Sequence, residues 1–294
     1  EIKFDIWCGF IFINFDENAK PLDEYLGVLP RHFENWKLED RYIETHVIKK
    51  LPANWKVSAE AFLEAYHVLE THSEGVYTAG DANADYDIFG DHISRFVHTI
   101  GYTSPHITEN RPTEQEIFDI LMGRRTKEGS GQKLPEGTSA REAYAGHVQE
   151  TMKERFKQDF SHLTVTETID SIEYFAFPNA FFFPGLQLSM VYRFRPNGVD
   201  GALFDLLFLR PKPVDGPCPP PPEPFQLEIE DSYTKCPGTE FLGAVYDQDT
   251  NNLLSQTKGF KSSFKKGQSL GNYQEARTRH FHQTIDKYLE NING

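Results

Sequence analysis

Cysteine is scarce in this sequence of 294 residues, and long apolar runs are missing. The three cysteines, Cys8, Cys218 and Cys236, are too few and too scattered for a disulfide framework or a cysteine-only metal site. No run approaches the roughly 18–20 apolar residues that a transmembrane helix needs, and no signal peptide is recognisable. We therefore expect a soluble protein of the cytoplasm with no membrane partner.

Basic residues are outnumbered by acidic ones. Lysine and arginine total 30 and aspartate and glutamate total 44, which gives a formal net charge of −14 at pH 7. Such a surface repels phosphate backbones and anionic lipid headgroups, so we expect no nucleic-acid partner either. Aromatic side chains, by contrast, are abundant, with 24 Phe and 13 Tyr. This abundance favours a thick aromatic core or a large apolar cavity.

Hydrophobic periodicity and turn residues predict an α+β fold, with an antiparallel meander and helices on one face. The predicted strands are 5–15, 41–50, 93–100, 164–176, 180–195 and 201–210, and the predicted helices are 21–26, 55–71, 113–123, 140–158, 239–256 and 273–291. Residues 211–224 contain eight prolines and are expected to form an extended connection. No clear boundary divides this pattern, so we expect one domain over residues 1–294.

One predicted helix carries the most informative motif. Glu60, Glu64 and His67 are spaced at i, i+4 and i+7, which places them on one face of a helix. His72 follows His67 by five residues, so both imidazoles can reach one metal ion only if the helix ends or distorts between them. Small residues and a glycine at positions 71–75 favour such a break.

The spacing of the two histidines leaves alternatives open. It matches neither of the zinc-peptidase patterns, H-E-x-x-H and H-x-x-E-H, which disfavours a zinc hydrolase. A chance pair among 11 histidines is compatible with the spacing alone. The two carboxylates on the same predicted face favour a metal site, because a helix does not bury glutamate without a partner.

The run Asn54-Trp55-Lys56, followed by E-x3-E-x2-H-x4-H, resembles the mononuclear-iron motif of Rieske-type ring-hydroxylating oxygenases, in their α-subunit catalytic domain. The family pattern is usually E-N-x2-[D/E]-x2-H-x4-H, and this sequence has Ala61 where Asn is common. Residues 7–14 resemble the strand that follows the Rieske domain, and residues 246–259 resemble the late helix that supplies the third ligand. The resemblance therefore spans most of the chain.

The resemblance implies that His67, His72 and Asp249 are iron ligands. Two histidines and one carboxylate leave open positions on Fe(II) for dioxygen beside the substrate. Asp249 is chosen because its offset to a later Lys-Gly pair aligns without a gap, and Asp247 stays open as the alternative. Glu64 is implied to be catalytic, as the acidic residue that links a Rieske histidine of a neighbouring subunit to an iron-ligating histidine.

The same resemblance implies a helix-grip fold of the START/Bet v 1-like kind, in which a curved antiparallel sheet and helices enclose an apolar cavity. Phe62 and Tyr66 flank the motif, and Phe182 lies in a phenylalanine-rich predicted strand. These three are candidate substrate-binding residues, because an aromatic pocket selects flat apolar substrates. Packing in the core is the alternative for each of them.

The implied function is activation of O2 at a mononuclear Fe(II) to hydroxylate an aromatic or hydrophobic substrate, by cis-dihydroxylation, monohydroxylation or demethylation. Electrons would come from NAD(P)H through a reductase or ferredoxin and a Rieske [2Fe–2S] cluster. That cluster needs C-x-H and C-x2-H, and this sequence has neither. We therefore expect the N-terminal Rieske domain to be absent and the chain alone to be inactive.

The electron path of the family runs between subunits, which implies a homotrimer or an α3β3 assembly. A different class of function also stays open. A helix-grip protein can bind a hydrophobic ligand without redox chemistry, and the presence or absence of bound iron would distinguish the two.

Overall fold

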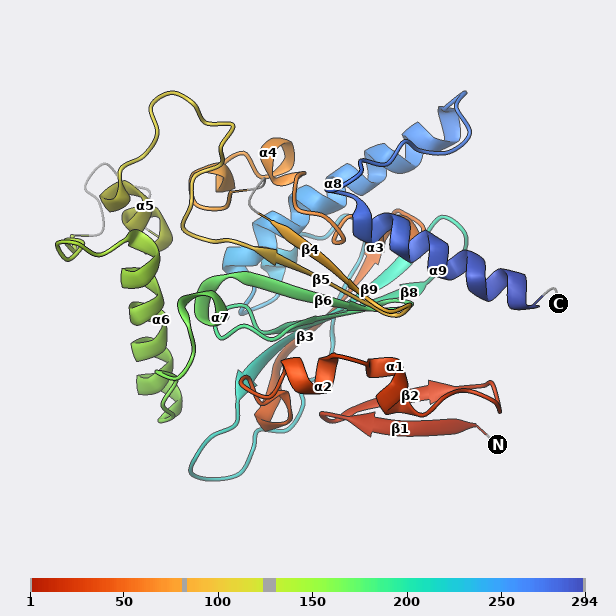
Figure 1. The fold of residues 1–294 in the computed structure, drawn as a ribbon, viewed down its shortest axis with the longest axis horizontal. Coiled ribbons are helices and arrows are strands. Elements are labelled where there is room, and N and C mark those ends of the chain that lie inside the picture. The colour runs from red at the N-terminus through yellow and green to blue at the C-terminus, as the bar shows by residue number, and fades with distance from the viewer. Residues whose placement is uncertain (1, 81–83, 124–130, 293–294) are drawn as a thin grey trace.

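The computed structural model describes residues 2–80, 84–123 and 131–292 (Figure 1). The helices are α1 (Leu22–Leu26), α2 (Leu29–His32), α3 (Trp55–Glu60), α4 (Val68–Thr71), α5 (Glu114–Leu121), α6 (Ala140–Phe156), α7 (Val165–Ile169), α8 (Glu240–Ser262) and α9 (Ala276–Ile292), with short 3-10 turns η1 (Leu38–Asp40), η2 (Gly75–Tyr77) and η4 (Tyr233–Lys235). The strands are β1 (Lys3–Trp7), β2 (Phe10–Asn14), β3 (Arg41–Leu51), β4 (Asp85–Phe89), β5 (Ile93–His98), β6 (Ser171–Ala176), β7 (Ala180–Phe183), β8 (Met190–Pro196), β9 (Ala202–Pro211) and β10 (Phe225–Leu227). In this described part of the chain, no helix combines the length and the hydrophobicity that crossing a bilayer requires.

Eight strands form one sheet in the order β10-β3-β9-β8-β7-β6-β5-β4. Every neighbouring pair is antiparallel except β10 and β3, which run parallel. The predicted antiparallel meander is confirmed, because β6, β7, β8 and β9 pair in the order in which they follow along the chain. The prediction of one strand over residues 180–195 is wrong, because that stretch forms the two paired strands β7 and β8. The proline-rich stretch enters no helix and leads into β10 at the sheet edge.

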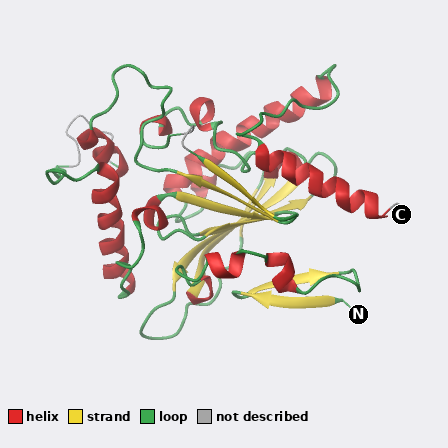
Figure 2. Cartoon of the chain, in the orientation of Figure 1, coloured by secondary structure: helices red, strands yellow, loops and turns green. Residues whose placement is uncertain are grey.

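Both faces of this sheet are covered. Figure 2 shows the sheet as a middle layer, with α3, α8 and α9 on one side and α1, α2 and the β1–β2 hairpin on the other. One apolar cluster, which includes Phe204 and Phe281, fills the side of α8 and α9. A second, which includes Leu29 and Phe33, fills the opposite side. The prediction of helices on one face only is therefore wrong.

The predicted strand over residues 5–15 is a hairpin instead. Trp7 pairs with Phe10, so the connecting loop is only Cys8 and Gly9, and their φ angles are 50° and 84°. Two positive φ values at a two-residue loop are what a type I′ turn needs, and glycine reaches such values at little cost. The glycine inside the apolar run was therefore a turn signal rather than part of one buried strand.

The predicted strand over residues 164–176 also divides, because its first part is α7. Thr164 Oγ1 accepts a hydrogen bond from the backbone N–H of Glu167, and the Glu167 carboxylate accepts one from Thr164 N. This capping box starts the helix. The same pattern correctly predicted the start of α5 at Thr113, so the sequence carried the signal at both positions.

Asp205, on β9, is a buried carboxylate that contacts two arginines and a histidine. Its oxygens lie 2.6 Å from Arg195 Nε, 3.3 Å from Arg193 Nε and 3.3 Å from His46 Nε2. Burial alone would raise the pKa of Asp205, but the hydrogen bonds from His46 and the two arginines lower it from 3.8 to about 2. A carboxyl with a lowered pKa stabilises the folded state above its unfolded pKa, and the contribution is lost as the pH falls to the folded value.

We therefore expect Asp205→Asn to lower the free energy of unfolding by about 2 kcal/mol at neutral pH, since one pKa unit corresponds to about 1.4 kcal/mol. The loss should shrink as the pH falls from about 4 towards 2, the interval set by the unfolded and folded values. Urea unfolding of both proteins at neutral pH and at about pH 3 measures the difference. An equal loss at the two pH values would contradict this account of Asp205.

Candidate metal centre

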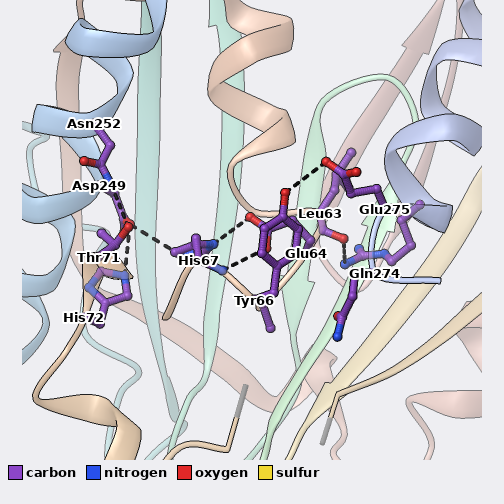
Figure 3. A network of polar contacts seen from close by, with 12 residues as sticks. Leu63, Glu64, Tyr66, His67, Thr71, His72, Asp249, Asn252, Gln274 and Glu275 are labelled. Carbon is purple, nitrogen blue, oxygen red and sulfur yellow. Dashed lines mark hydrogen bonds and ion pairs between the residues drawn. The ribbon is translucent and has the colours of Figure 1, made fainter. Parts of the chain in front are cut away.

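His67, His72 and Asp249 meet where α4 faces α8 (Figure 3). His72 Nε2 lies 3.0 Å from Asp249 Oδ1, and His67 Nε2 lies 3.6 Å from the same oxygen. One possible ligand atom from each of the three lies within 4.8 Å of the other two. Among the residues that the structure describes, this is the only group of three or more His, Cys, Asp or Glu side chains that meets this spacing.

The local structure explains how two histidines five residues apart reach one point. His67 is the N-cap residue of α4, and His72 is its C-cap residue, with φ of −115° and ψ of 52°. The predicted break between the histidines is therefore confirmed. The prediction of one helix over residues 55–71 is wrong, because the chain leaves the helical conformation between α3 and α4, so Glu60 and Glu64 do not share a helix face.

The second nitrogen of each imidazole is held by an oxygen. His67 Nδ1 lies 2.7 Å from Glu64 Oε1, and His72 Nδ1 lies 2.7 Å from Gln248 Oε1. Carboxylate and amide oxygens only accept hydrogen bonds, so each neutral imidazole carries its proton on Nδ1 and keeps a lone pair on Nε2. Both lone pairs therefore face the Asp249 carboxylate.

When both imidazoles are neutral, three electron-rich atoms lie at this spacing, and they repel one another unless a proton or a metal cation lies among them. Burial lowers the pKa of His67, whereas the hydrogen bond and charge of Glu64 and the charge of Asp249 raise it, and the balance lies above the usual value. The site therefore favours positive charge. Two imidazoles and one carboxylate are the donor set of non-heme Fe(II) sites, and the residues present fit such an ion.

The structure also separates the two candidate aspartates of α8. Asp249 is buried on the side of the helix that faces the histidines. Asp247 instead accepts hydrogen bonds from Ser232 Oγ at 2.6 Å and from Tyr233 N at 3.1 Å, and so fixes η4 against the helix. Of the two, the structure brings Asp249 to the histidine pair.

Comparison with known protein families is consistent with this geometry. Residues 30–291 match the family described as the ring hydroxylating alpha subunit, catalytic domain. The chain belongs to this family.

Curated relatives of this chain match over a short stretch. The carnitine monooxygenase oxygenase subunit of Acinetobacter pittii is 33% identical over 73 residues, which is 24% of this chain and 20% of that protein. The glycine betaine monooxygenase oxygenase subunit of Pseudomonas aeruginosa is 32% identical over 66 residues, which is 22% of this chain and 15% of that protein. The aligned region is therefore a fifth or less of either relative.

Solved structures match over nearly the whole chain. The quaternary ammonium Rieske monooxygenase CntA has a TM-score of 0.59 at 15% identity, covering 98% of this chain and 61% of that one. Naphthalene 1,2-dioxygenase with indole bound has a TM-score of 0.54 at 15% identity, covering 96% of this chain and 63% of that one. The α+β helix-grip fold implied by the resemblance is confirmed, and this chain spans less than two thirds of either neighbour.

Two amide side chains near this centre escaped the sequence analysis. Gln248 holds His72, and Asn252 Nδ2 donates to Thr71 Oγ1 at 2.6 Å, so both connect α8 to α4. They lie at i and i+4 on the predicted helix, on either side of Asp249. Amides at that spacing around a candidate ligand were the available signal, since i and i+4 share a helix face.

We expect Gln248→Leu to weaken divalent metal binding by about 10-fold, because partners that orient a ligating histidine contribute about 10–100-fold to affinity. Asn251→Leu is a matched control on the exposed side of the same helix and should bind metal as the wild type does. Anaerobic titration with Co(II) measures both affinities. Equal affinities for the two variants would show that Gln248 does not hold His72 in the metal-bound protein.

Phe62, Tyr66 and Glu60 are placed in different ways around the centre. The Phe62 ring lies 5.5 Å from the rings of Tyr192 and Phe194, within the cluster under α8 and α9. The Tyr66 side chain is exposed, and its hydroxyl donates to Glu275 Oε1 at 3.0 Å. Glu60 pairs with a histidine of α9 rather than with the metal ligands.

Phe182 packs on the opposite face of the sheet from this centre, which does not support it as a substrate contact, and that role stays a prediction. Its ring packs 5.4 Å from Trp7 and 6.4 Å from Phe33, on the opposite face of the sheet. Successive side chains of a strand point to opposite faces, so Phe181 and Phe183 belong to the cluster on the metal side and Phe182 does not. The run of phenylalanines concealed this alternation.

Proposed function

We propose that this chain is the catalytic domain of a Rieske oxygenase that holds one Fe(II) through His67, His72 and Asp249. Its reaction would be the hydroxylation of an aromatic or hydrophobic organic substrate with O2. The observation that carries the proposal is the convergence of two imidazole lone pairs and one carboxylate oxygen on a single point. A bound iron would supply the activation of dioxygen beside the substrate.

The side chains around the ligands have a defined part in this function. Glu64 and Gln248 keep the proton of each imidazole on Nδ1, so that both Nε2 atoms remain available to a metal ion. Asp249 supplies the negative charge of the ligand set from a buried position. Together the contacts from Glu64 and Gln248 fix the tautomer and direction of both imidazoles before a metal ion binds.

Glu64 is also proposed as the entry point for electrons. Its carboxylate contacts His67. Tyr66, two residues further along the chain, is exposed. Electrons would come from NAD(P)H through a reductase or ferredoxin and a Rieske [2Fe–2S] cluster of a neighbouring subunit. An electron path between subunits would require an assembly, for which we propose a homotrimer or an α3β3 complex, and we propose the cytoplasm as its location.

Two substrate classes are candidates. The aromatic cluster that contains Phe62, Phe183 and Tyr192 supports an aromatic or hydrophobic substrate. The curated relatives are named for carnitine and glycine betaine, which favours a quaternary ammonium compound as the second candidate. Aromatic rings also bind such cations through their negative faces, so the same cluster suits either class.

Product analysis under labelled dioxygen tests the proposal. The oxygenase, together with its Rieske domain and a reductase, is supplied with NAD(P)H, isotopically labelled O2 and panels of aromatic and quaternary ammonium compounds. We expect labelled oxygen in the product of one panel. A protein that holds no iron, oxidises neither panel and binds a hydrophobic compound unchanged would instead be the helix-grip binding protein that the sequence left open.

A further inference from the structure

The segment that carries Glu64 is held in place from the start of α9. Between α3 and α4 the chain is not helical, yet three contacts fix it, and Figure 3 shows the one between Tyr66 and Glu275. The Leu63 carbonyl accepts from Arg277 Nη1 at 3.3 Å, and the Tyr66 hydroxyl donates to Glu275 Oε1 at 3.0 Å. The third contact reaches the residue after Glu64 through a tyrosine.

That tyrosine is Tyr86, on β4. Its hydroxyl accepts from the backbone N–H of Ala65 at 3.1 Å and donates to Gln274 Oε1 at 2.9 Å. The backbone groups on both sides of Glu64 are therefore held, one through Arg277 and one through Tyr86. Neither contact touches the metal ligands directly.

Arg277 makes this attachment rigid. It is fully buried, and its Nη2 lies 2.7 Å from Glu173 Oε1 while its Nε donates to Ser94 Oγ at 3.1 Å. Glu173 and Ser94 lie on β6 and β5, so the guanidinium joins the sheet to the Leu63 carbonyl. A buried guanidinium is tolerated only when its donors are satisfied, and here one of them is committed to the segment next to Glu64.

We propose that Tyr86, Gln274, Glu275 and Arg277, which we name the α9 clamp, are positioning residues that aim Glu64 at His67. Because the backbone on both sides of Glu64 is fixed, both oxygens of its carboxylate contact the same residue, His67. Oε1 lies 2.7 Å from His67 Nδ1, and Oε2 accepts from His67 N at 3.1 Å. The clamp thus sets the imidazole tautomer and metal affinity of the centre, and this inference rests on the proposed function.

The test compares Tyr86→Phe and Arg277→Lys with matched controls elsewhere in the chain. Tyr144→Phe removes another partly buried hydroxyl, which bonds Gln187, and Arg141→Lys alters another buried arginine, which pairs with Asp170. Co(II) titration of the four variants should show about 10-fold weaker binding for the two clamp variants, as expected for partners that orient a metal ligand. The two controls should bind as the wild type does.

A second readout separates positioning from general loosening. In Zn(II)-loaded protein labelled with 15N-histidine, the Nδ1 proton of His67 should exchange with solvent about 10-fold faster in the clamp variants. The Nδ1 proton of His72, which is held by Gln248, should keep its wild-type rate and serves as an internal control. Equal acceleration of both protons, or of neither, would overturn the clamp.

The outcomes also distinguish the clamp from the proposed function. If the wild type and all four variants bind metal with the same affinity, the proposal of the α9 clamp is wrong, whereas the proposed iron site is unaffected. If the wild type binds neither Zn(II) nor Fe(II), the proposed function fails, and the exchange rate of the His67 Nδ1 proton in metal-free protein still tests the clamp. If Arg277→Lys fails to fold, Tyr86→Phe decides the question alone.

Discussion

Replacing Asp249 with alanine is expected to weaken the binding of Fe(II) by more than about 100-fold. The side chain is the only carboxylate of the ligand set, and its Oδ1 lies between the two imidazoles, 3.0 Å from one Nε2 and 3.6 Å from the other. Partners that merely orient a metal ligand contribute about 10–100-fold, so loss of a charged ligand should cost more. Metal content after anaerobic reconstitution and desalting measures the effect.

Asp247→Asn is the matched control for this experiment. Asparagine can still accept the hydrogen bonds that Asp247 receives from Ser232 and Tyr233, so this variant should fold and keep its iron. Iron retained by Asp249→Ala, or lost equally by both variants, would contradict the assignment of Asp249 as a ligand.

Replacing Glu64 with glutamine should separate iron binding from turnover. Glutamine keeps an oxygen that can accept from His67 Nδ1 and loses only the acceptor for His67 N, so iron content after reconstitution with excess Fe(II) should stay near the wild-type level. The negative charge proposed to link the electron donor to the centre is removed, and we expect product formation to fall by about 100-fold, the upper end of the range for outer partners of metal ligands. Metal analysis and product yield on the same preparation measure both quantities.

Glu60→Gln provides the control for Glu64. Glu60 lies 2.8 Å from His282 on α9 and contacts no proposed ligand, so its replacement should leave both iron content and product yield unchanged. If Glu64→Gln turns over at the wild-type rate, the proposed electron path through this carboxylate is wrong.

The sequence predicted which three side chains come together better than it predicted the backbone that presents them. The spacing of His67 and His72 demanded a break in the helix, and the structure has it at the end of α4. The sequence did not indicate the second interruption of the helix, between Glu60 and Val68, because the spacing of apolar residues across it is typical of a helix. Contacts from α9 that lie more than 200 residues away along the chain hold that segment, and tertiary contacts override local propensity.

The alternation of apolar and polar residues does not indicate which way a side chain points when both faces of a strand are buried. Phe181, Phe182 and Phe183 are all buried, because apolar clusters fill both sides of the sheet. A strand buried on both faces reads as a continuous apolar run. The sequence therefore could not show that Phe182 faces away from the metal ligands.

Anomalous diffraction at the iron absorption edge tests the central claim most directly. Crystals of the wild-type protein, grown and kept without oxygen after reconstitution with Fe(II), would provide the data. The account predicts a single peak per chain within bonding distance of His67 Nε2, His72 Nε2 and Asp249. A peak at other residues, a signal only at the zinc edge, or no peak at this site would contradict it.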